Sequence, residues 1–435
     1  MTAITSRALL ALTFAAGLNG AIFSTAFAAR AAAPDEAASG TAVSKEFASS
    51  FNDAQDLLKA GKGAEALAKL HALDVQADVT PYEKYLILRL RAPAEYAAND
   101  ATSAATDFDA LTTNSFLPAA DRVQMLRALS TVLYSSEQYA KATVALQRYI
   151  DAGGDDAKLR GLLPQAQYMN KDYAAASKGF RAEADATYAA GNVPTEKSLR
   201  LLASAYSQAD DDAGYVWALE HVAVAYPKAD YWKEVVARGI HATKGSERTY
   251  VEGYRLKTQL LGSVSESDRI TYAAMAAHEG YPEEAKHVLD EAYANKPFTG
   301  NDLVEANKLR VEVNKAVTND HAQQAASEAA ARNAKDGNAL VSQGLLETVD
   351  GNAQQGSQLI AQGIAKGGLK APEDAKLHLG YAQIKSGQDA DALKTFQSIN
   401  GDPTGIQPIV HVWTLYAQSR LHAGAAPAPA AAASK

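Results

Sequence analysis

The side chains that could carry out chemistry include nine histidines and many carboxylates, but no cysteine. The chain therefore has no thiolate nucleophile, no disulfide and no Cys-ligated zinc. The stretch "HEGYPEEAKH" (278–287) begins like a zinc-binding helix, but Pro282 interrupts it and its two histidines fall on opposite sides of a turn. It lacks the i, i+4 histidine pair on one helix face that such a helix needs. We expect no metal site and no cofactor.

Three other patterns of enzyme sites are incomplete or missing. The stretch "GIHATKGS" (239–246) has Gly and Lys, but not in the order G-x-x-x-x-G-K-[ST] of a phosphate-binding loop. No G-x-S-x-G nucleophile motif occurs. The run "DDD" (210–212) falls at an expected turn and has no downstream Glu at calcium-loop spacing. The sequence predicts that the protein is not an enzyme.

The net charge of the chain limits its binding partners, and its N-terminal residues indicate where in the cell it is located. The 435-residue chain has 42 Lys+Arg against 50 Asp+Glu, a formal net charge of −8, which disfavours nucleic acid and anionic membranes as partners. At the start, Arg7 precedes an apolar stretch, and Ala26, Phe27 and Ala28 form a signal-peptidase pattern. The stretch is shorter than the ~20 residues that span a bilayer. We predict a cleavable signal peptide (1–28), a periplasmic location and no direct membrane insertion after cleavage.

The elements that would position any site form a recurring pattern. In "AKLHLGYAQIKSGQDADALKTFQSI" (375–399), two glycines stand within an apolar helical pattern. Gly in a helix interior costs about 1 kcal/mol relative to Ala, so we expect a close helix–helix approach at Gly380. We expect a left-handed turn residue at Gly387. The same skeleton recurs, starting at Leu129, Leu163, Leu202, Tyr272 and Gln343.

This skeleton resembles the tetratricopeptide repeat, a helix–turn–helix unit of about 34 residues. The resemblance covers most of residues 46–400 and implies an all-α, right-handed α-solenoid of stacked helix pairs. We place this solenoid at 46–422, between a disordered linker (29–45) and a disordered Ala/Pro tail (423–435). Within it, 83–111 is expected to have an irregular turn near Pro93, and 301–337 to form two helices broken at 318–320. An unrelated bundle of amphipathic helices is the alternative.

Tetratricopeptide solenoids bind partners on a concave face lined by the first helix of each unit. The resemblance therefore implies a binding groove at the exposed positions of these first helices. Its Lys, Arg and amide side chains would suit an extended acidic peptide or a C-terminal carboxylate. Alternatively, these side chains only solvate the helices. The predicted groove residues are Gln124, Arg127, Tyr134, Lys158, Gln165, Tyr168, Lys197 and Arg200, with Thr131, Gly161, Ser204 and Ser207 at matching positions.

A narrower resemblance is carried by "PTEKSLRLLASAYSQ" (194–208), "AVAYPKADYWKEVV" (223–236) and residues 365–399. These stretches are similar to the tetratricopeptide proteins that accompany TonB–ExbB–ExbD systems. The similarity implies a non-catalytic periplasmic scaffold for protein or peptide partners, in support of TonB-dependent transport. A second function stays open, a periplasmic carrier or envelope protein whose groove binds a small molecule or glycan. Glycan binding would require exposed, stacked Trp or Tyr, whereas we expect Trp217 and Trp232 to pack between helices.

Overall fold

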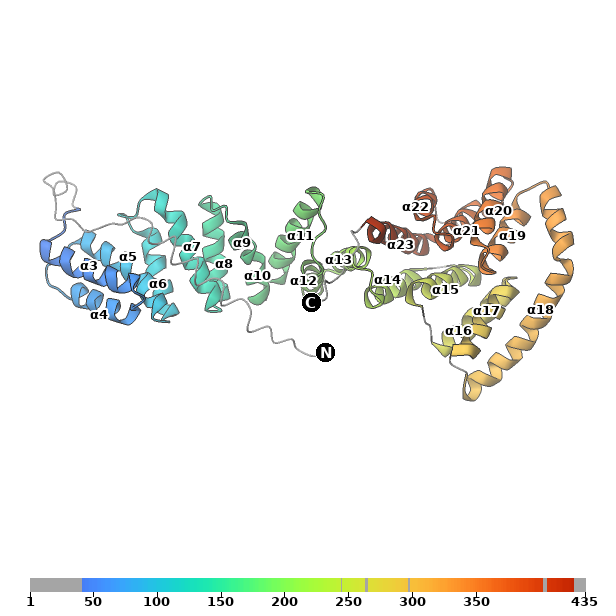
Figure 1. Ribbon diagram of the computed structural model, residues 1–435, viewed down its shortest axis with the longest axis horizontal. Helices are drawn as coiled ribbons and strands as arrows, with labels where there is room; N and C mark the ends of the chain where they lie inside the picture. Colours follow the sequence, from blue (N-terminus) through green and yellow to red (C-terminus); the bar gives the residue numbers. More distant parts are fainter. Residues whose placement is uncertain (1–40, 244, 263–264, 296–297, 402–404, 426–435) are drawn as a thin grey trace, which may run out of the picture. The chain divides into compact units, whose positions relative to one another are not determined.

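The computed structural model describes residues 41–243, 245–262, 265–295, 298–401 and 405–425. Within these residues the regular elements are 21 α-helices, α3 to α23, and no strand is present (Figure 1). The all-α prediction is therefore confirmed. The predicted signal peptide (1–28) lies outside the described residues, as do most of the predicted linker (29–45) and tail (423–435).

The chain divides into two compact units, which we describe separately. Unit 1 contains the described residues up to Asn192 together with Ser204–Asp211. Consecutive helices pack against each other as helix–turn–helix pairs, as the repeat pattern predicts. Its helices are α3 (Lys45–Lys59), α4 (Gly63–Asp74), α5 (Pro81–Ala97), α6 (Ala101–Thr113), α7 (Ala119–Ser135), α8 (Tyr139–Asp151), α9 (Ala157–Arg160), α10 (Leu162–Met169) and α11 (Tyr173–Ala189).

Unit 2 contains Val193–Ala203 and the described residues from Asp212 onward, so helix α12 (Glu196–Gln208) contributes to both units. Helix–turn–helix pairs again pack against their neighbours in sequence. The other helices of unit 2 are α13 (Asp212–Ala225), α14 (Ala229–Ala242), α15 (Glu247–Leu261), α16 (Glu266–His278), α17 (Pro282–Asn295), α18 (Gly300–Asn333), α19 (Asn338–Val349), α20 (Ala353–Lys366), α21 (Pro372–Lys385), α22 (Asp389–Gln397) and α23 (Gln407–Ala425).

The turns inside the pairs share one backbone conformation. The residues that align with Gly387 in the repeat skeleton all have positive φ, from 55° to 95°. A left-handed residue lets the chain leave one helix and enter the next, and glycine adopts it at the lowest cost. The aligned residues are Glu137, Lys171, Asp210, Gly280, Gly351 and Gly387. The register of the predicted repeat is therefore confirmed by the backbone itself.

Small residues sit where the two helices of a pair come closest. A Cβ atom at Gly380 would lie 2.2 Å from the ring of Phe396, so the aromatic ring occupies the space that a side chain would fill. On the second helix of four of the pairs, the aligned residue is a fully buried alanine: Ala142, Ala176, Ala285 and Ala392. These contacts confirm the expected close approach at Gly380.

Two predicted breaks are wrong. Helix α5 runs through Pro93 to Ala97, and the turn comes at 98–100. Pro93 removes one backbone N–H, but Ala92 and Ala94 on either side are fully buried, and this packing outweighs the local penalty. Helix α18 continues through 318–320, where the Oγ1 of Thr318 donates a hydrogen bond to the carbonyl of Asn314. A helical Thr often makes this bond, so a polar run alone did not end the helix.

Helix α23 packs against helices far away in the sequence. Besides α22, it contacts α13, α14 and α15 of the same unit. The ring of Trp413 is fully buried there, and Trp232 of α14 meets Tyr416 of α23 edge to face, with 5.9 Å between ring centroids. The Nε2 of His411 lies 2.8 Å from Glu220, 191 residues earlier. Unit 2 therefore closes on itself, whereas an open solenoid contacts only its sequence neighbours.

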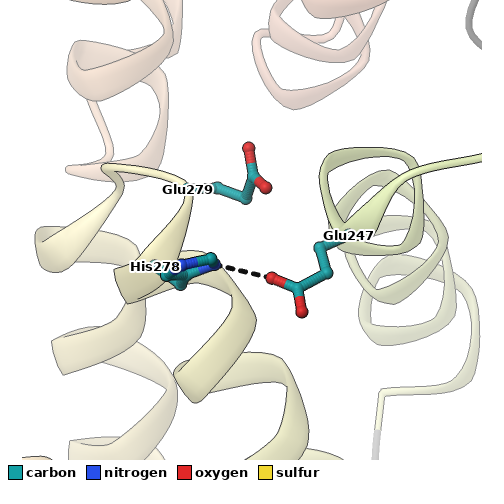
Figure 2. Close-up of side chains that lie close together, drawn as sticks. All are labelled: Glu247, His278 and Glu279. Atoms are coloured by element: carbon teal, nitrogen blue, oxygen red, sulfur yellow. Dashed lines mark hydrogen bonds and ion pairs between the residues drawn. The ribbon is translucent and has the colours of Figure 1, made fainter.

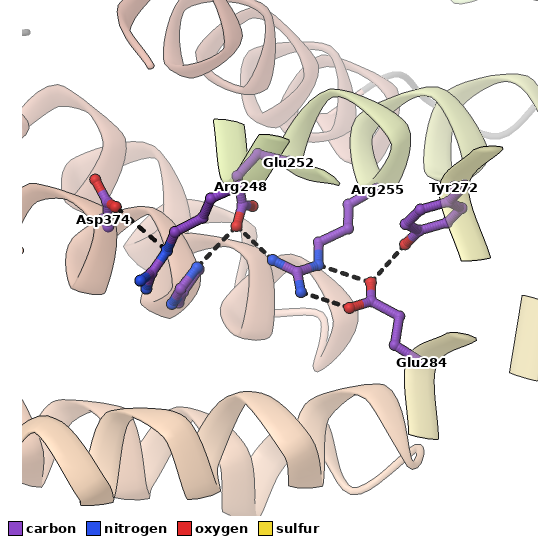
Figure 3. Close-up of polar contacts among 7 residues, drawn as sticks. Arg248, Glu252, Arg255, Tyr272, Glu284 and Asp374 are labelled. Carbon is purple, nitrogen blue, oxygen red and sulfur yellow. Dashed lines mark hydrogen bonds and ion pairs between the residues drawn. The ribbon is translucent and has the colours of Figure 1, made fainter. Parts of the chain in front are cut away.

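A buried polar network also joins distant repeats of unit 2 (Figure 3). Arg255 is bonded to Glu252 and Glu284, with 2.7 Å from its Nε to Glu284, and the Tyr272 hydroxyl donates to Glu284. The Nε2 of His378, on α21, lies 2.8 Å from Glu252. Burial opposes ionisation of Glu252, but Arg255 and His378 outweigh it and lower its pKa to about 2. The network therefore holds a charged carboxylate in the core and links α15 to α21.

Candidate binding surface on the first helices of unit 1

The predicted groove residues of unit 1 lie on three helices. Gln124, Arg127 and Tyr134 are on α7, Lys158 is on the short helix α9, and Gln165 and Tyr168 are on α10. Helices α9 and α10 form one broken first helix, interrupted at Gly161. Gln124, Arg127 and Lys158 are exposed, and the other three are half-buried.

Tyrosines and polar side chains connect successive first helices in a ladder. The hydroxyl of Tyr134 donates to the Oε1 of Gln165 at 3.3 Å. One repeat later, the hydroxyls of Tyr168 and Ser204 are hydrogen-bonded at 2.8 Å. Tyr134 is thereby linked to Gln165, and Tyr168 to Ser204, between successive first helices. We call these four residues the tyrosine–amide ladder.

Each ladder tyrosine packs against a second tyrosine on the following helix. Tyr134 packs edge to face on Tyr139, with 5.6 Å between centroids, and Tyr168 packs on Tyr173 at 5.3 Å. Such edge-to-face pairs add stability beyond the area that they bury. Burial and the neighbouring Tyr139 raise the pKa of Tyr134. Its hydroxyl therefore stays protonated near neutral pH and serves as a hydrogen-bond donor.

The positive charge of this surface is smaller than the sequence indicated. The guanidinium of Arg127 lies 2.9 Å from the carboxylate of Asp156, which also caps the start of α9 through the N–H groups of Lys158 and Leu159. Asp156 was missed by the sequence analysis, although an Asp just before a helix is a common N-cap signal. Lys158 has no ion-pair partner among the described residues of unit 1. The surface is therefore rich in donors but not strongly cationic.

Not every predicted position joins the surface. Thr131 is buried, and its Oγ1 donates to the Arg127 carbonyl of the same helix, so its predicted exposure is wrong. Lys197 and Arg200 are exposed, but they lie in the part of α12 that belongs to unit 2. There, Lys228 and Tyr231 bond Glu196 and lower its pKa, with Arg200 contributing through its charge. The structure therefore does not place these two cations on the surface of unit 1.

Unit 2 offers a different concave feature. A cavity of about 550 Å³ lies along α20, beside Arg332 near the end of α18. Its wall is mostly amide, and it includes Asn352, Gln354, Gln355, Gln358 and Gln362. Because side-chain amides both donate and accept hydrogen bonds, such a wall matches a neutral polar ligand better than a charged one.

Comparison with known proteins assigns no family to the chain. No family model matches the sequence, and no curated protein is similar to it. Among solved structures, the crystal structure of the P58(IPK) TPR domain is similar at 12% sequence identity, over 87% of this chain and 99% of that one, with a TM-score of 0.23. A score this low supports no argument. The helix pairs, their positive-φ turns and their small-residue contacts themselves define an all-α protein of repeated helix–turn–helix units.

Proposed function

We propose that the chain is a non-catalytic scaffold that binds protein or peptide partners on the first-helix face of unit 1. The observation that supports this most directly is the tyrosine–amide ladder, in which a tyrosine of one first helix bonds a polar side chain of the next in two successive repeats. Half-buried tyrosines held in place by neighbours lose little entropy on binding, and Tyr and Arg are enriched at binding hot spots. Gln124, Arg127 and Lys158 add exposed hydrogen-bond donors on the same first helices.

We further propose that the partners are periplasmic and include components of a TonB–ExbB–ExbD complex. This is supported by the predicted signal peptide (1–28) and by the three stretches that resemble the tetratricopeptide proteins of such systems. No helix among the described residues is long and apolar enough to cross a bilayer.

The proposal is tested by reversing charge on the surface of unit 1. The double variant Arg127→Glu, Lys158→Glu changes two exposed side chains on the first helices that carry the ladder. It breaks the partly exposed Arg127–Asp156 pair, which contributes little to stability, so the fold should persist. Affinity capture from a periplasmic extract should then recover the partner with the unaltered chain and lose most of it with the variant. Lys178→Glu, an exposed change on the second helix α11, is the control. Equal recovery by all three chains would contradict binding at this face.

A second candidate function, a carrier for a small molecule or glycan, is favoured by the amide-lined cavity in unit 2. The aromatic residues argue against it. Trp232 is buried, and Trp217 stacks on His221 of its own helix at 3.6 Å between centroids. Titration of the chain with neutral oligosaccharides, monitored by NMR chemical shifts, would distinguish the carrier function from the scaffold function. Saturable chemical-shift changes that disappear in the double variant Gln358→Ala, Gln362→Ala would support the carrier function and not the scaffold function.

A further inference from the structure

The stretch that fails as a zinc helix contributes to a different arrangement in the folded chain. His278 ends α16, and Glu279 follows it as the C-cap residue. Glu247 begins α15, 31 residues before His278. Figure 2 shows the three side chains in one place, with the imidazole of His278 facing the carboxylate of Glu247. We propose that Glu247, His278 and Glu279 form a binding site for a divalent transition-metal ion of the zinc type.

The geometry brings three donor atoms within reach of one ion. The imidazole nitrogen and one oxygen from each carboxylate all lie within 4.8 Å of one another. The Nδ1 of His278 is 2.6 Å from the Oε2 of Glu247. Zinc binds nitrogen and carboxylate oxygen at about 2.0–2.2 Å, so two ligand atoms on one tetrahedral ion lie about 3.4 Å apart. The His278 nitrogen and the Glu247 oxygen must therefore move apart, and the Glu279 oxygen must settle at the same spacing. Exposed side chains change rotamer within nanoseconds, so side-chain rotation can supply this adjustment.

The ligand types select the class of ion. Imidazole suits zinc, copper and nickel, whereas calcium and magnesium take oxygen ligands. Three protein ligands with open positions for water are typical of a zinc site that is not purely structural. The set therefore points to a first-row transition ion bound at a solvent-accessible position.

Local charge provides a second reason. Two carboxylates face a single imidazole, and the side-chain carboxylate of Glu279 has no hydrogen bond or ion pair with any described residue. It also sits at the carboxyl end of α16, where the helix dipole is negative and a cation is favoured. An ordinary ion pair between His278 and Glu247 would leave the charge of Glu279 unbalanced. A divalent ion would balance both carboxylates and would tie the start of α15 to the end of α16.

Isothermal titration of the full chain with Zn²⁺ alone near neutral pH tests this site. We expect one saturable ion per chain that excess Mg²⁺ does not displace. His278→Ala, Glu247→Gln and Glu279→Gln should each weaken binding by about tenfold or more. His287→Ala, in the same stretch but on α17, should leave the affinity unchanged. Titration with Co²⁺ should give the d–d absorption of a bound ion, and His278→Ala should lose it.

Several results would overturn the site. One is the absence of saturable binding, and another is equal affinity in the chain with His278→Ala. Loss with His278→Ala but not with either glutamine variant would mean that zinc binds the imidazole alone. Because the donors are mostly exposed, the circular dichroism of the variants should match that of the unaltered chain. The test is independent of partner binding on unit 1, so failure of one proposal leaves the other standing.

Discussion

Glu95 is a buried carboxyl whose ionisation opposes folding. Burial and the neighbouring Asp107 carboxylate raise its pKa to about 7, and its Oε2 has no hydrogen-bond partner among the described residues. In the unfolded chain a Glu titrates near 4.3. The folded state therefore binds an extra proton between about pH 4.3 and 7, and the free energy of unfolding falls as pH rises through that range.

We expect Glu95→Gln to stabilise unit 1 at pH 8 by on the order of 1–3 kcal/mol, because the glutamine carries no charge to bury. The gain should vanish near pH 4. Urea denaturation followed by circular dichroism at several pH values measures it. Arg91 keeps Asp74 and Asp107 as partners, so it is not left unpaired. The exposed change Glu46→Gln is the control, and an identical pH profile for both variants would contradict the assignment.

Arg255 presents the opposite case, a buried charge that is fully paired. Removing it would leave Glu252 and Glu284 facing each other in the core. We expect Arg255→Met to destabilise unit 2 by about 3–5 kcal/mol, the usual cost of breaking a buried ion pair.

The control is Arg238→Ala, which breaks exposed pairs with Asp212 and Glu234 and should cost about 1 kcal/mol or less. Tryptophan fluorescence in urea reports unit 2 alone, since Trp217, Trp232 and Trp413 all lie there. Equal urea midpoints for the Arg255→Met and Arg238→Ala variants would contradict the predicted difference in stability.

At the scale of single residues, the sequence could predict which helix face a side chain occupies, but not which side chain it contacts. Tyr134, Gln165 and Tyr168 follow from the repeat register, because one offset of 34 residues places both tyrosines on first helices. The pairing of Arg127 with Asp156 does not follow, because it depends on a loop between two repeats. Glu247 could not be linked to His278 from spacing, because only the packing of α15 on α16 brings them together.

At the scale of helices, the repeat skeleton predicted the pairs better than their ends. Small residues mark steric requirements that recur in most pairs, so the turn at Gly387 and the close contact at Gly380 were predictable. Pro93 and the run at 318–320 were misread, because their local preference is a few kcal/mol at most and tertiary packing outweighs it. Helix ends are therefore set by packing where local signals and burial disagree.

The contact between Gly380 and Phe396 gives a prediction for helix pairing. Gly→Ala in a helix interior normally stabilises by about 0.5–1 kcal/mol. Here the new methyl group would meet the ring at 2.2 Å, so we expect Gly380→Ala to destabilise unit 2 by about 1–3 kcal/mol. Phe396→Leu in the same chain should restore part of the loss. Urea unfolding monitored by tryptophan fluorescence measures the double-mutant cycle, and strictly additive effects would show that the ring is not the obstacle.

At the scale of the molecule, the closure of unit 2 is the feature that the sequence could not indicate. A repeat pattern encodes contacts between neighbours, because the same residues recur at each interface. The contact of α23 with α13 and α14 joins segments with no common period, and the apolar face of α23 reads like that of any other helix. The two compact units were likewise not predicted, since the repeat pattern itself continues through α12.

Because α23 packs on α13 and α14, a destabilising substitution in α23 should also destabilise these helices, which are far away in the sequence. Trp413 is fully buried against Tyr381, Phe396 and Tyr416, so Trp413→Ala should leave a cavity that costs about 3–5 kcal/mol. If α23 closes unit 2, amide hydrogen exchange should rise in α13 and α14 as well as in α21 and α22, while α5 to α8 of unit 1 keep their protection. Leu421→Ala, a partly exposed change on the same helix, is the control and should alter little. An increase confined to α21 and α22 would mean that unit 2 behaves as an open array, in which each helix is stabilised only by its sequence neighbours.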